Sequence, residues 1–177
     1  MTQIQIKNII NTIGKMKDLK RSGWVMFNVK LPESDADHSF GVALLAIMLT
    51  PKHLNKQRCM ELALIHDLAE VYAGDFTPHD NISKEDKDNL ERKGALRLSK
   101  ELNWPNLIDL VNEYNDKKTP EARFVCLLDK LETVMTAQYY DDNKRAPNNV
   151  TDEFLAYAQQ YVKQFEACEI KDLIDNF

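Results

Sequence analysis

The sequence predicts an all-α protein, a single compact domain of about seven helices over residues 1–177. Apolar residues recur at the three- and four-residue spacing of amphipathic helices, and no segment shows the alternation of a strand. Only 5 Gly and 6 Pro are present, which favours long uninterrupted elements. No internal repeat or linker divides the chain, and 177 residues suffice for one hydrophobic core without disulfides.

The first elements are expected to be two helices joined by a loop. Residues 3–20 carry apolar side chains at helical spacing and should end before Ser22-Gly23. A loop is expected as far as Pro32, which disfavours helix in the residue before it. Ser34, followed by acidic residues, predicts the N-cap of a second helix that ends before Pro51.

Five further helices are expected from apolar periodicity and end signals. In order, they are residues 55–72, closed by Gly74; residues 83–102; a short helix over 107–114; residues 120–140, capped by Thr119; and a last helix capped by Thr151.

Composition excludes several classes of partner. The net charge of −5 argues against a nucleic-acid polymer, and no apolar run approaches the ~18 residues that span a bilayer. The first residues lack a charged segment and a cleavage site, so a cytoplasmic protein is expected. The three cysteines are far apart, which favours neither a disulfide framework nor a CxxC site.

Positive charge gathers at the beginning of this acidic chain. Residues 1–30 carry six Lys or Arg against the single acid Asp18, a net +5 that leaves −10 for the rest. A local positive rim of this kind suits a small anionic ligand.

Two titratable residues, His66 and Asp67, stand within the apolar third helix. Burying both requires compensation, and a metal ion would compensate both, since imidazole nitrogen and carboxylate oxygen are ligands of Zn, Mn, Fe and Co. Glu70 is expected on the same helix face as His66, four residues earlier. Asp75, just after the helix, can fold back over that end.

Two more candidates lie on other helices. His38 belongs to the first turn of the second helix and is expected to point inward, and Asp129 lies in the apolar run 125–131. Taken singly, a satisfied core histidine and an exposed acid paired with Lys130 are the commoner outcomes. Four candidate ligands from three helices together favour a metal site.

The segments around these residues closely resemble the HD-domain family, and more narrowly its small 5′-deoxynucleotidase branch. They read SDADH at 34–38, ALIHDLAE at 63–70, GDFTP at 74–78 and LLDKLE at 127–132. Upstream, KRSGWV at 20–25 matches the Arg-x-Gly-Trp segment of that branch. The resemblance covers residues from about 13 to 140.

The resemblance implies a helical HD fold and a set of roles. It implies one divalent cation (Mn, Co, Mg, Fe or Zn) bound by His38, His66, Asp67 and Asp129. It further implies that Glu70 assists attack on phosphorus, that Arg21 orients the phosphate, that Asp75 approaches the sugar, and that a second cation can lie near Glu70 and Asp75. Without the resemblance, Arg21 would be interpreted as an exposed charge at a helix end.

Trp24 has two interpretations. It is either a hydrophobic plug over the core or a wall of the sugar pocket that excludes a 2′-hydroxyl. Thr77 and Pro78 are expected to shape the pocket mouth, so the expected substrate-binding residues are Arg21, Trp24, Asp75 and Thr77.

The sequence therefore predicts metal-dependent hydrolysis of deoxyribonucleoside 5′-monophosphates, small-molecule substrates, to deoxynucleoside and phosphate. Two alternatives stay open: an HD phosphohydrolase acting on a triphosphate, cyclic or stringent-response nucleotide, and a non-catalytic helical module with a structural metal. A homodimer is expected from the resemblance and from surplus apolar residues in the late helices, which could equally be core. These residues are Phe154, Tyr157, Tyr161 and Phe165.

Overall fold

The computed structural model describes residues 2–77, 79–166 and 168–177, and these form ten helices and no named strand, which confirms the all-α prediction. Pro78, expected at the pocket mouth, lies outside the described residues. The helices are α1 Gln3–Asp18, α2 Ser22–Met26, α3 Asp35–Leu49, α4 Lys56–Ile65, α5 Glu70–Ala73, α6 Lys84–Glu101, α7 Leu107–Asn115, α8 Pro120–Asp142, α9 Thr151–Val162 and α10 Glu169–Asp175.

Two predicted helix starts are confirmed by hydrogen bonds. The Ser34 hydroxyl accepts from the Asp37 amide at 3.2 Å, and the Asp37 carboxylate accepts from the Ser34 amide at 2.9 Å, which is a complete capping box. Thr119 accepts from the Ala122 amide, and Pro120 occupies the first turn of α8. Local sequence therefore determines where α3 and α8 begin.

The expected helix over residues 55–72 is interrupted in the structure. α4 ends at Ile65 and α5 begins at Glu70. Between them the Leu68 amide donates to the Ile65 carbonyl and the Glu70 amide to the Asp67 carbonyl, which are three-residue bonds of a tight turn. The prediction that Glu70 lies on a continuous helix face is therefore wrong.

Packing against α6 accounts for this turn. A Cβ atom added at Gly94 of α6 would lie 2.5 Å from the carbonyl oxygen of Ala69, so α6 approaches the turn backbone more closely than any other residue type allows. This tertiary contact fixes the chain where α4 would otherwise continue.

Three further details differ from the prediction. α2 lies in the expected loop and α10 was not expected, because five and seven residues are too few for a periodic signal. Thr151 is the first residue of α9 and not its cap, since its hydroxyl donates to the Asp141 carboxylate at 2.6 Å.

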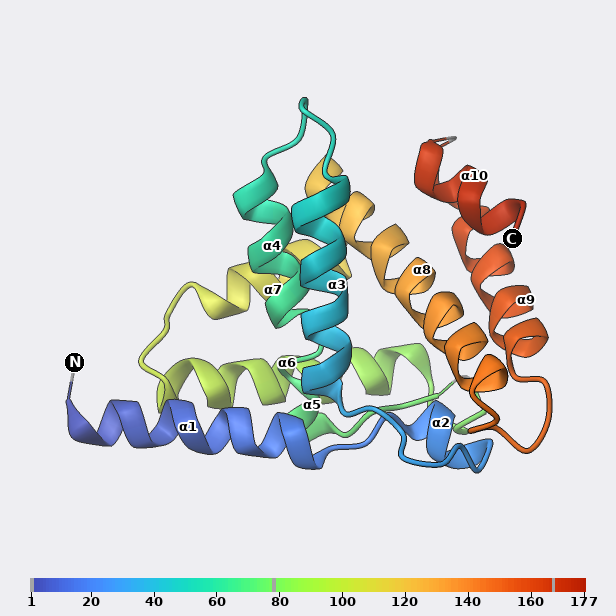
Figure 1. Ribbon diagram of the computed structural model, residues 1–177. Helices are drawn as coiled ribbons and strands as arrows, with labels where there is room; N and C mark the ends of the chain where they lie inside the picture. Colours follow the sequence, from blue (N-terminus) through green and yellow to red (C-terminus); the bar gives the residue numbers. More distant parts are fainter. Residues whose placement is uncertain (1, 78, 167) are drawn as a thin grey trace.

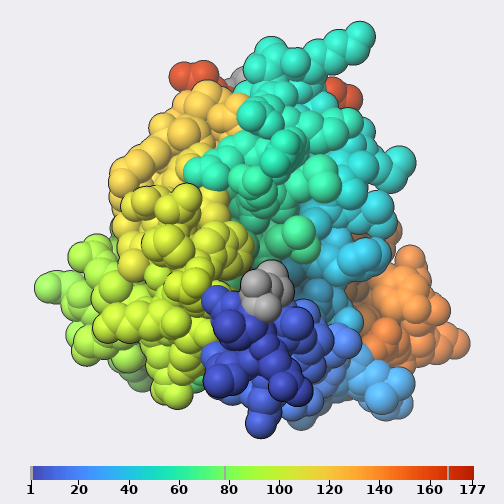
Figure 2. All heavy atoms as spheres, turned by 90° about the vertical axis from the view of Figure 1, so that its left-hand side faces the viewer, coloured from blue at the N-terminus to red at the C-terminus, as the bar shows by residue number. Residues whose placement is uncertain are grey.

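The core forms around α8, which crosses the molecule with α9 along one side and α3 and α4 along the other (Figure 1). α1 lies at the end of the molecule opposite α10, and its Asn8 side chain donates to the Glu101 carbonyl of α6 at 2.8 Å. Figure 2 shows α1 lying beside α6. The turn after α4 and the first turn of α3 thus meet α8 in the interior.

Exposed apolar side chains lie on α1 and α3 as well as on the late helices. Phe165 is buried, and Phe154 stacks on Trp24 with ring centroids 4.1 Å apart. On α3, by contrast, Phe40 and Met48 are 67% and 73% exposed, with further exposed apolar residues between them. No helix of the described part of the chain is long and apolar enough to cross a membrane.

Candidate active site

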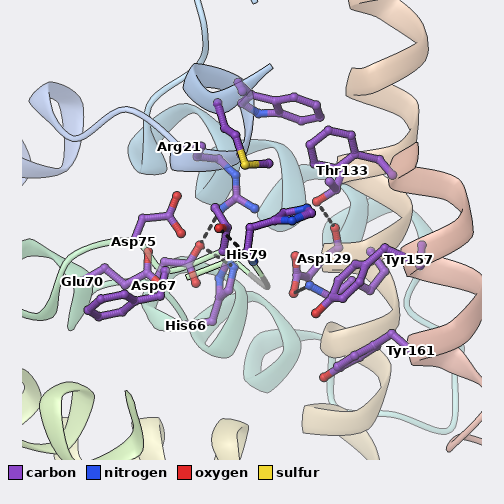
Figure 3. A pocket seen from close by; sticks show the side chains of 18 of the residues that line it. Arg21, His66, Asp67, Glu70, Asp75, His79, Asp129, Thr133, Tyr157 and Tyr161 are labelled. Carbon is purple, nitrogen blue, oxygen red and sulfur yellow. Dashed lines mark hydrogen bonds and ion pairs between the residues drawn. The ribbon is translucent and has the colours of Figure 1, made fainter. Parts of the chain in front are cut away.

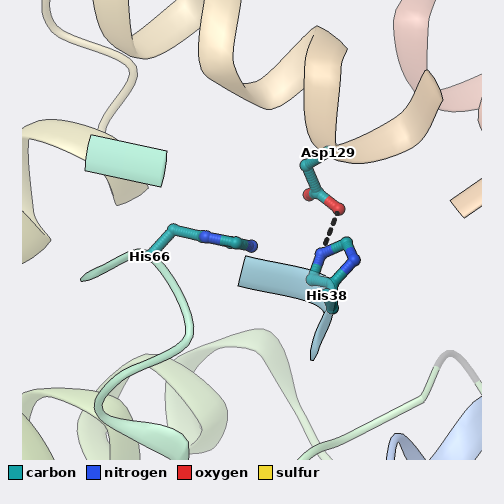
Figure 4. A group of neighbouring side chains, drawn as sticks. All are labelled: His38, His66 and Asp129. Atoms are coloured by element: carbon teal, nitrogen blue, oxygen red, sulfur yellow. Dashed lines mark ion pairs between the residues drawn. The ribbon is translucent and has the colours of Figure 1, made fainter. Parts of the chain in front are cut away.

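Four predicted ligand residues meet in the interior. His38 comes from the first turn of α3, His66 and Asp67 from the turn after α4, and Asp129 from the middle of α8. His38, His66 and Asp129 are buried, and their side chains point toward one another (Figure 4).

Their polar atoms lie close enough to share one ion. His38 Nε2 is 3.3 Å from Asp129 Oδ1 and 3.8 Å from Asp67 Oδ2. His66 Nε2 is 3.2 Å from the same Asp67 oxygen. The structure therefore brings together all four residues that the sequence singled out.

Hydrogen bonds on the far side of each imidazole determine which nitrogen faces this cluster. His38 Nδ1 lies 2.6 Å from Glu132 Oε2, and His66 Nδ1 lies 2.8 Å from the Ala63 carbonyl oxygen. Both partners are acceptors, so each Nδ1 carries a proton and each Nε2 faces the cluster, where a neutral imidazole offers its lone pair to a metal ion.

The two imidazole nitrogens that face the cluster have no hydrogen-bond partner of their own in the described part of the chain. Both Nε2 atoms are buried and have no hydrogen-bond partner among the described residues. Two imidazole nitrogens that face two carboxylates in an interior need a shared cation, a proton or a metal ion, between them. This donor set fits a divalent metal ion.

The charge state of the two aspartates agrees with that role. Burial acts to raise the pKa of Asp129, but Lys130 and His38 outweigh it and hold the pKa well below its usual range. Burial likewise acts on Asp67, whose pKa is lowered by His66 and then by Arg21. Both carboxyl groups are therefore ionised, as a metal ligand must be.

Arg21 reaches the same cluster from the segment before α2. An antiparallel bridge between Lys20 and Ser34 holds this segment beside the start of α3. Arg21 Nη1 donates to Asp67 Oδ2 at 3.0 Å, and Nε lies 3.6 Å from Glu33 Oε1. The guanidinium is thus not the exposed helix-end charge of the alternative interpretation.

A second acidic group adjoins the first. Glu70 and Asp75, both predicted site residues, lie together with Asp35, and one oxygen of each carboxylate is within 4.8 Å of the others. The Ser22 hydroxyl donates to the Asp75 carbonyl at 2.9 Å, which ties this loop to α2. Burial, with the neighbouring Asp67 and Asp75, raises the pKa of Glu70 well above its usual value.

A cavity of about 520 Å³ opens over both groups (Figure 3). Its lining includes every predicted site residue except the fully buried His38: Arg21, Trp24, His66, Asp67, Glu70, Asp75, Thr77 and Asp129. The Thr77 hydroxyl donates to Asp80 at 2.9 Å and so shapes the loop at the cavity edge.

Trp24 combines features of both interpretations. It is only 1% exposed, packs between Tyr140 and Phe154, and donates through Nε1 to Glu33 at 2.8 Å. Its packing is that of a plug, although the residue also belongs to the cavity lining.

The sequence interpretation missed four residues around the site. Asp35 was interpreted as an acid that complements the helix dipole, and Glu132 and Glu33 gave no signal. Lys130 was expected in an exposed pair, but its Nζ lies 3.0 Å from Asp129 Oδ2 with both side chains largely buried. Only tertiary contacts identify these four, because each is an ordinary charged residue in its local sequence.

Comparisons with known proteins agree with this geometry. The family described as HD domain matches residues 13–169. The human protein named 5′-deoxynucleotidase HDDC2 is 36% identical over 155 residues, which cover 86% of this chain and 76% of the human one. The protein of the same name from Dictyostelium discoideum is 40% identical over 139 residues, 72% of this chain and 73% of that one.

A solved structure shows the same fold. The PH0347 protein from Pyrococcus horikoshii OT3 superposes with a TM-score of 0.77 and 29% identity, over 97% of this chain and 96% of that chain. With the family match over residues 13–169 and relatives more than 30% identical over most of their length, this chain belongs to the HD-domain family.

Proposed function

We propose that this protein is a metal-dependent phosphohydrolase that converts deoxyribonucleoside 5′-monophosphates to deoxynucleoside and phosphate. The observation that carries the proposal is the buried convergence of two imidazole and two carboxylate groups at a cavity that also receives Arg21. Relatives named 5′-deoxynucleotidase, 36–40% identical to this chain, support the substrate class.

The donor chemistry narrows the choice of cation. His38 and His66 offer nitrogen, and Asp67 and Asp129 offer oxygen, a mixture that suits Mn, Fe, Co or Zn better than Mg. When bound, such a cation activates water and polarises the phosphoryl group. Because the donors border a cavity, positions for water and substrate stay open, unlike in a closed structural site.

Three residues of the chain have roles around the phosphate and sugar. Arg21 presents a planar donor fork that pairs with phosphate oxygens. Glu70, whose pKa is raised above its usual value mainly by burial, can act as general acid or base during attack on phosphorus. Asp75 lines the same cavity and can accept a hydrogen bond from a sugar hydroxyl.

The charges around the cavity favour a monophosphate over larger nucleotides. Besides Arg21, the cavity receives Lys87 and Lys130, and each is paired with an acid: Lys87 Nζ is 3.6 Å from Glu91, and Lys130 is 3.0 Å from Asp129. Further phosphates would therefore meet the carboxylates of the cavity with little added positive charge.

We expect the wild type to release phosphate from a deoxyribonucleoside monophosphate roughly ten- to a hundredfold more efficiently than from the matching ribonucleotide. The reason is that a 2′-hydroxyl facing the apolar Trp24 wall would lose its hydrogen bonds, at about 1–3 kcal/mol. The measurement is kcat/KM for one base as deoxy monophosphate, ribo monophosphate and deoxy triphosphate, with added Mn, Co or Mg.

Trp24→Phe is the matched variant, since it keeps an aromatic plug while removing bulk and the donor to Glu33. It should narrow the preference for deoxyribose. Equal wild-type rates on the two monophosphates would disprove the sugar wall alone, whereas a preference for the triphosphate would disprove the nucleotidase proposal.

Two wider expectations accompany this proposal. A cytoplasmic location stays a prediction. A homodimer is also proposed, now through the exposed apolar residues of α3 between Phe40 and Met48, because a second copy packed there would bury a row of exposed apolar side chains. The mass of the wild type and of Met48→Glu in solution tests it, with a dimer expected for the first and a monomer for the second; a monomeric wild type contradicts it.

A further inference from the structure

We propose that Asp35 is the third carboxylate ligand of the second cation, which the family resemblance already implies near Glu70 and Asp75, so that this site consists entirely of oxygen ligands and is separate from the His38, His66, Asp67 and Asp129 centre. The inference deepens the proposed function, on which it rests only in that Glu70 and Asp75 belong to the same pocket. What it adds is the role of Asp35 and the resulting difference in ligand chemistry between the two sites.

Asp35 is buried in a way that its place in α3 does not explain. It is the first residue of α3, where an exposed acid would complement the helix dipole. The residue is 0% exposed, however, and neither carboxylate oxygen has a hydrogen-bond partner among the described residues. Ser34 and Asp37 already form the helix cap, so Asp35 has no capping role.

The buried carboxylate lies in a group of three. One oxygen each of Asp35, Glu70 and Asp75 lies within 4.8 Å of the others, and Glu70 Oε2 is also buried without a partner. The three side chains come from α3, α5 and the loop after α5, so the fold and not local sequence brings them together.

Like charges this close repel unless they bind a cation or a proton. Arg21, whose charge acts on Asp35 and Glu70, directs its hydrogen bond to Asp67. Asp35 and Glu70 bury carboxylate oxygens without a donor among the described residues, so their charges need a cation beside them. A divalent cation satisfies the same oxygens while leaving all three groups ionised.

The ligand atoms predict which cation this site prefers. Oxygen-only sites suit hard cations such as Mg²⁺ and Mn²⁺, whereas imidazole ligands favour Zn, Co and Fe. The two sites should therefore differ in selectivity, with the His-containing centre holding Co²⁺ or Zn²⁺ while the Asp35 site exchanges Mg²⁺ or Mn²⁺.

The experiment measures cation binding without substrate. Protein loaded with one equivalent of Co²⁺ is titrated with Mn²⁺, and bound Mn²⁺ is followed by electron paramagnetic resonance. We expect one further Mn²⁺ per chain in wild type, bound at least tenfold more weakly by Asp35→Asn, with the Co²⁺ content unchanged.

Asp37→Asn is the matched control. It makes the same substitution in the same helical turn, but Asp37 contacts Ser34 and its amide replacement can still accept the capping bond. It should bind Mn²⁺ like wild type. Circular dichroism establishes that both variants keep the helical content of wild type.

A wild type that takes up no second cation, or an Asp35→Asn variant that binds it as well as wild type does, would overturn the inference. If Asp35→Asn does not fold, anomalous diffraction from a wild-type crystal soaked in Mn²⁺ decides. An ion at about 2.0–2.6 Å from an Asp35 oxygen supports the site, and its absence there contradicts it. No turnover is measured in this experiment, so the absence of the second cation would leave the hydrolase proposal untouched. A second cation bound by a protein that hydrolyses no nucleotide would support the Asp35 site and contradict the hydrolase proposal.

Discussion

Asp67→Ala is expected to lose bound cation and phosphohydrolase activity together. The Asp67 carboxylate lies 3.2 Å from His66 Nε2 and 3.8 Å from His38 Nε2, and it also accepts from Arg21 at 3.0 Å. The substitution removes a negatively charged ligand. It also removes the hydrogen-bond partner of Arg21, the residue proposed to pair with the phosphate. Metal content after purification and phosphate release measured on the same sample check this, and His66→Ala should behave alike.

His53→Ala serves as the control, because His53 is exposed and has no contact with the cluster. It should keep wild-type metal content and turnover. An Asp67→Ala protein with stoichiometric metal and normal turnover would show that the ligand assignment is wrong.

Glu70→Ala is expected to keep the cation at the His38 and His66 centre while turnover falls by roughly 10²-fold or more. Glu70 is buried and one of its oxygens has no hydrogen-bond partner among the described residues, so replacing it removes an acid whose burial is unfavourable. Both imidazoles stay in place, because each is held by its own Nδ1 hydrogen bond. Cobalt content and kcat measured in parallel separate binding from chemistry.

Two outcomes would contradict that role of Glu70. Loss of the cobalt in step with activity would make Glu70 a ligand of the first centre, and unchanged turnover would remove it from the reaction. Glu61→Ala, in a surface acid of α4, controls for the loss of a negative charge, and it should leave both quantities unchanged.

Much of the fold follows from short-range sequence signals. Ser34 and Thr119 sit at the cap positions that their neighbours predict, because capping depends on residues three positions apart. The turn at residues 66–69 could not be predicted in this way. It depends on the close approach of Gly94, which is more than twenty residues away in sequence.

The site residues also divide into those that the sequence reveals and those that only the fold reveals. His66, Asp67 and Asp129 are recognisable because titratable groups interrupt apolar runs, and the family resemblance adds Arg21 and the role of Glu70. Asp35 was not recognisable, because an acid at the start of a helix is ordinary until its burial is known.

The central claim is that one buried set of nitrogen and oxygen donors holds the cation on which hydrolysis depends. The most direct measurement is a titration of chelator-stripped wild type with Mn²⁺ or Co²⁺, in which bound cation and phosphate release from a deoxyribonucleoside 5′-monophosphate are followed together. We expect no release from the stripped protein and a rate that rises as the His38, His66, Asp67 and Asp129 centre fills. Full phosphate release from protein shown to be free of metal would contradict it.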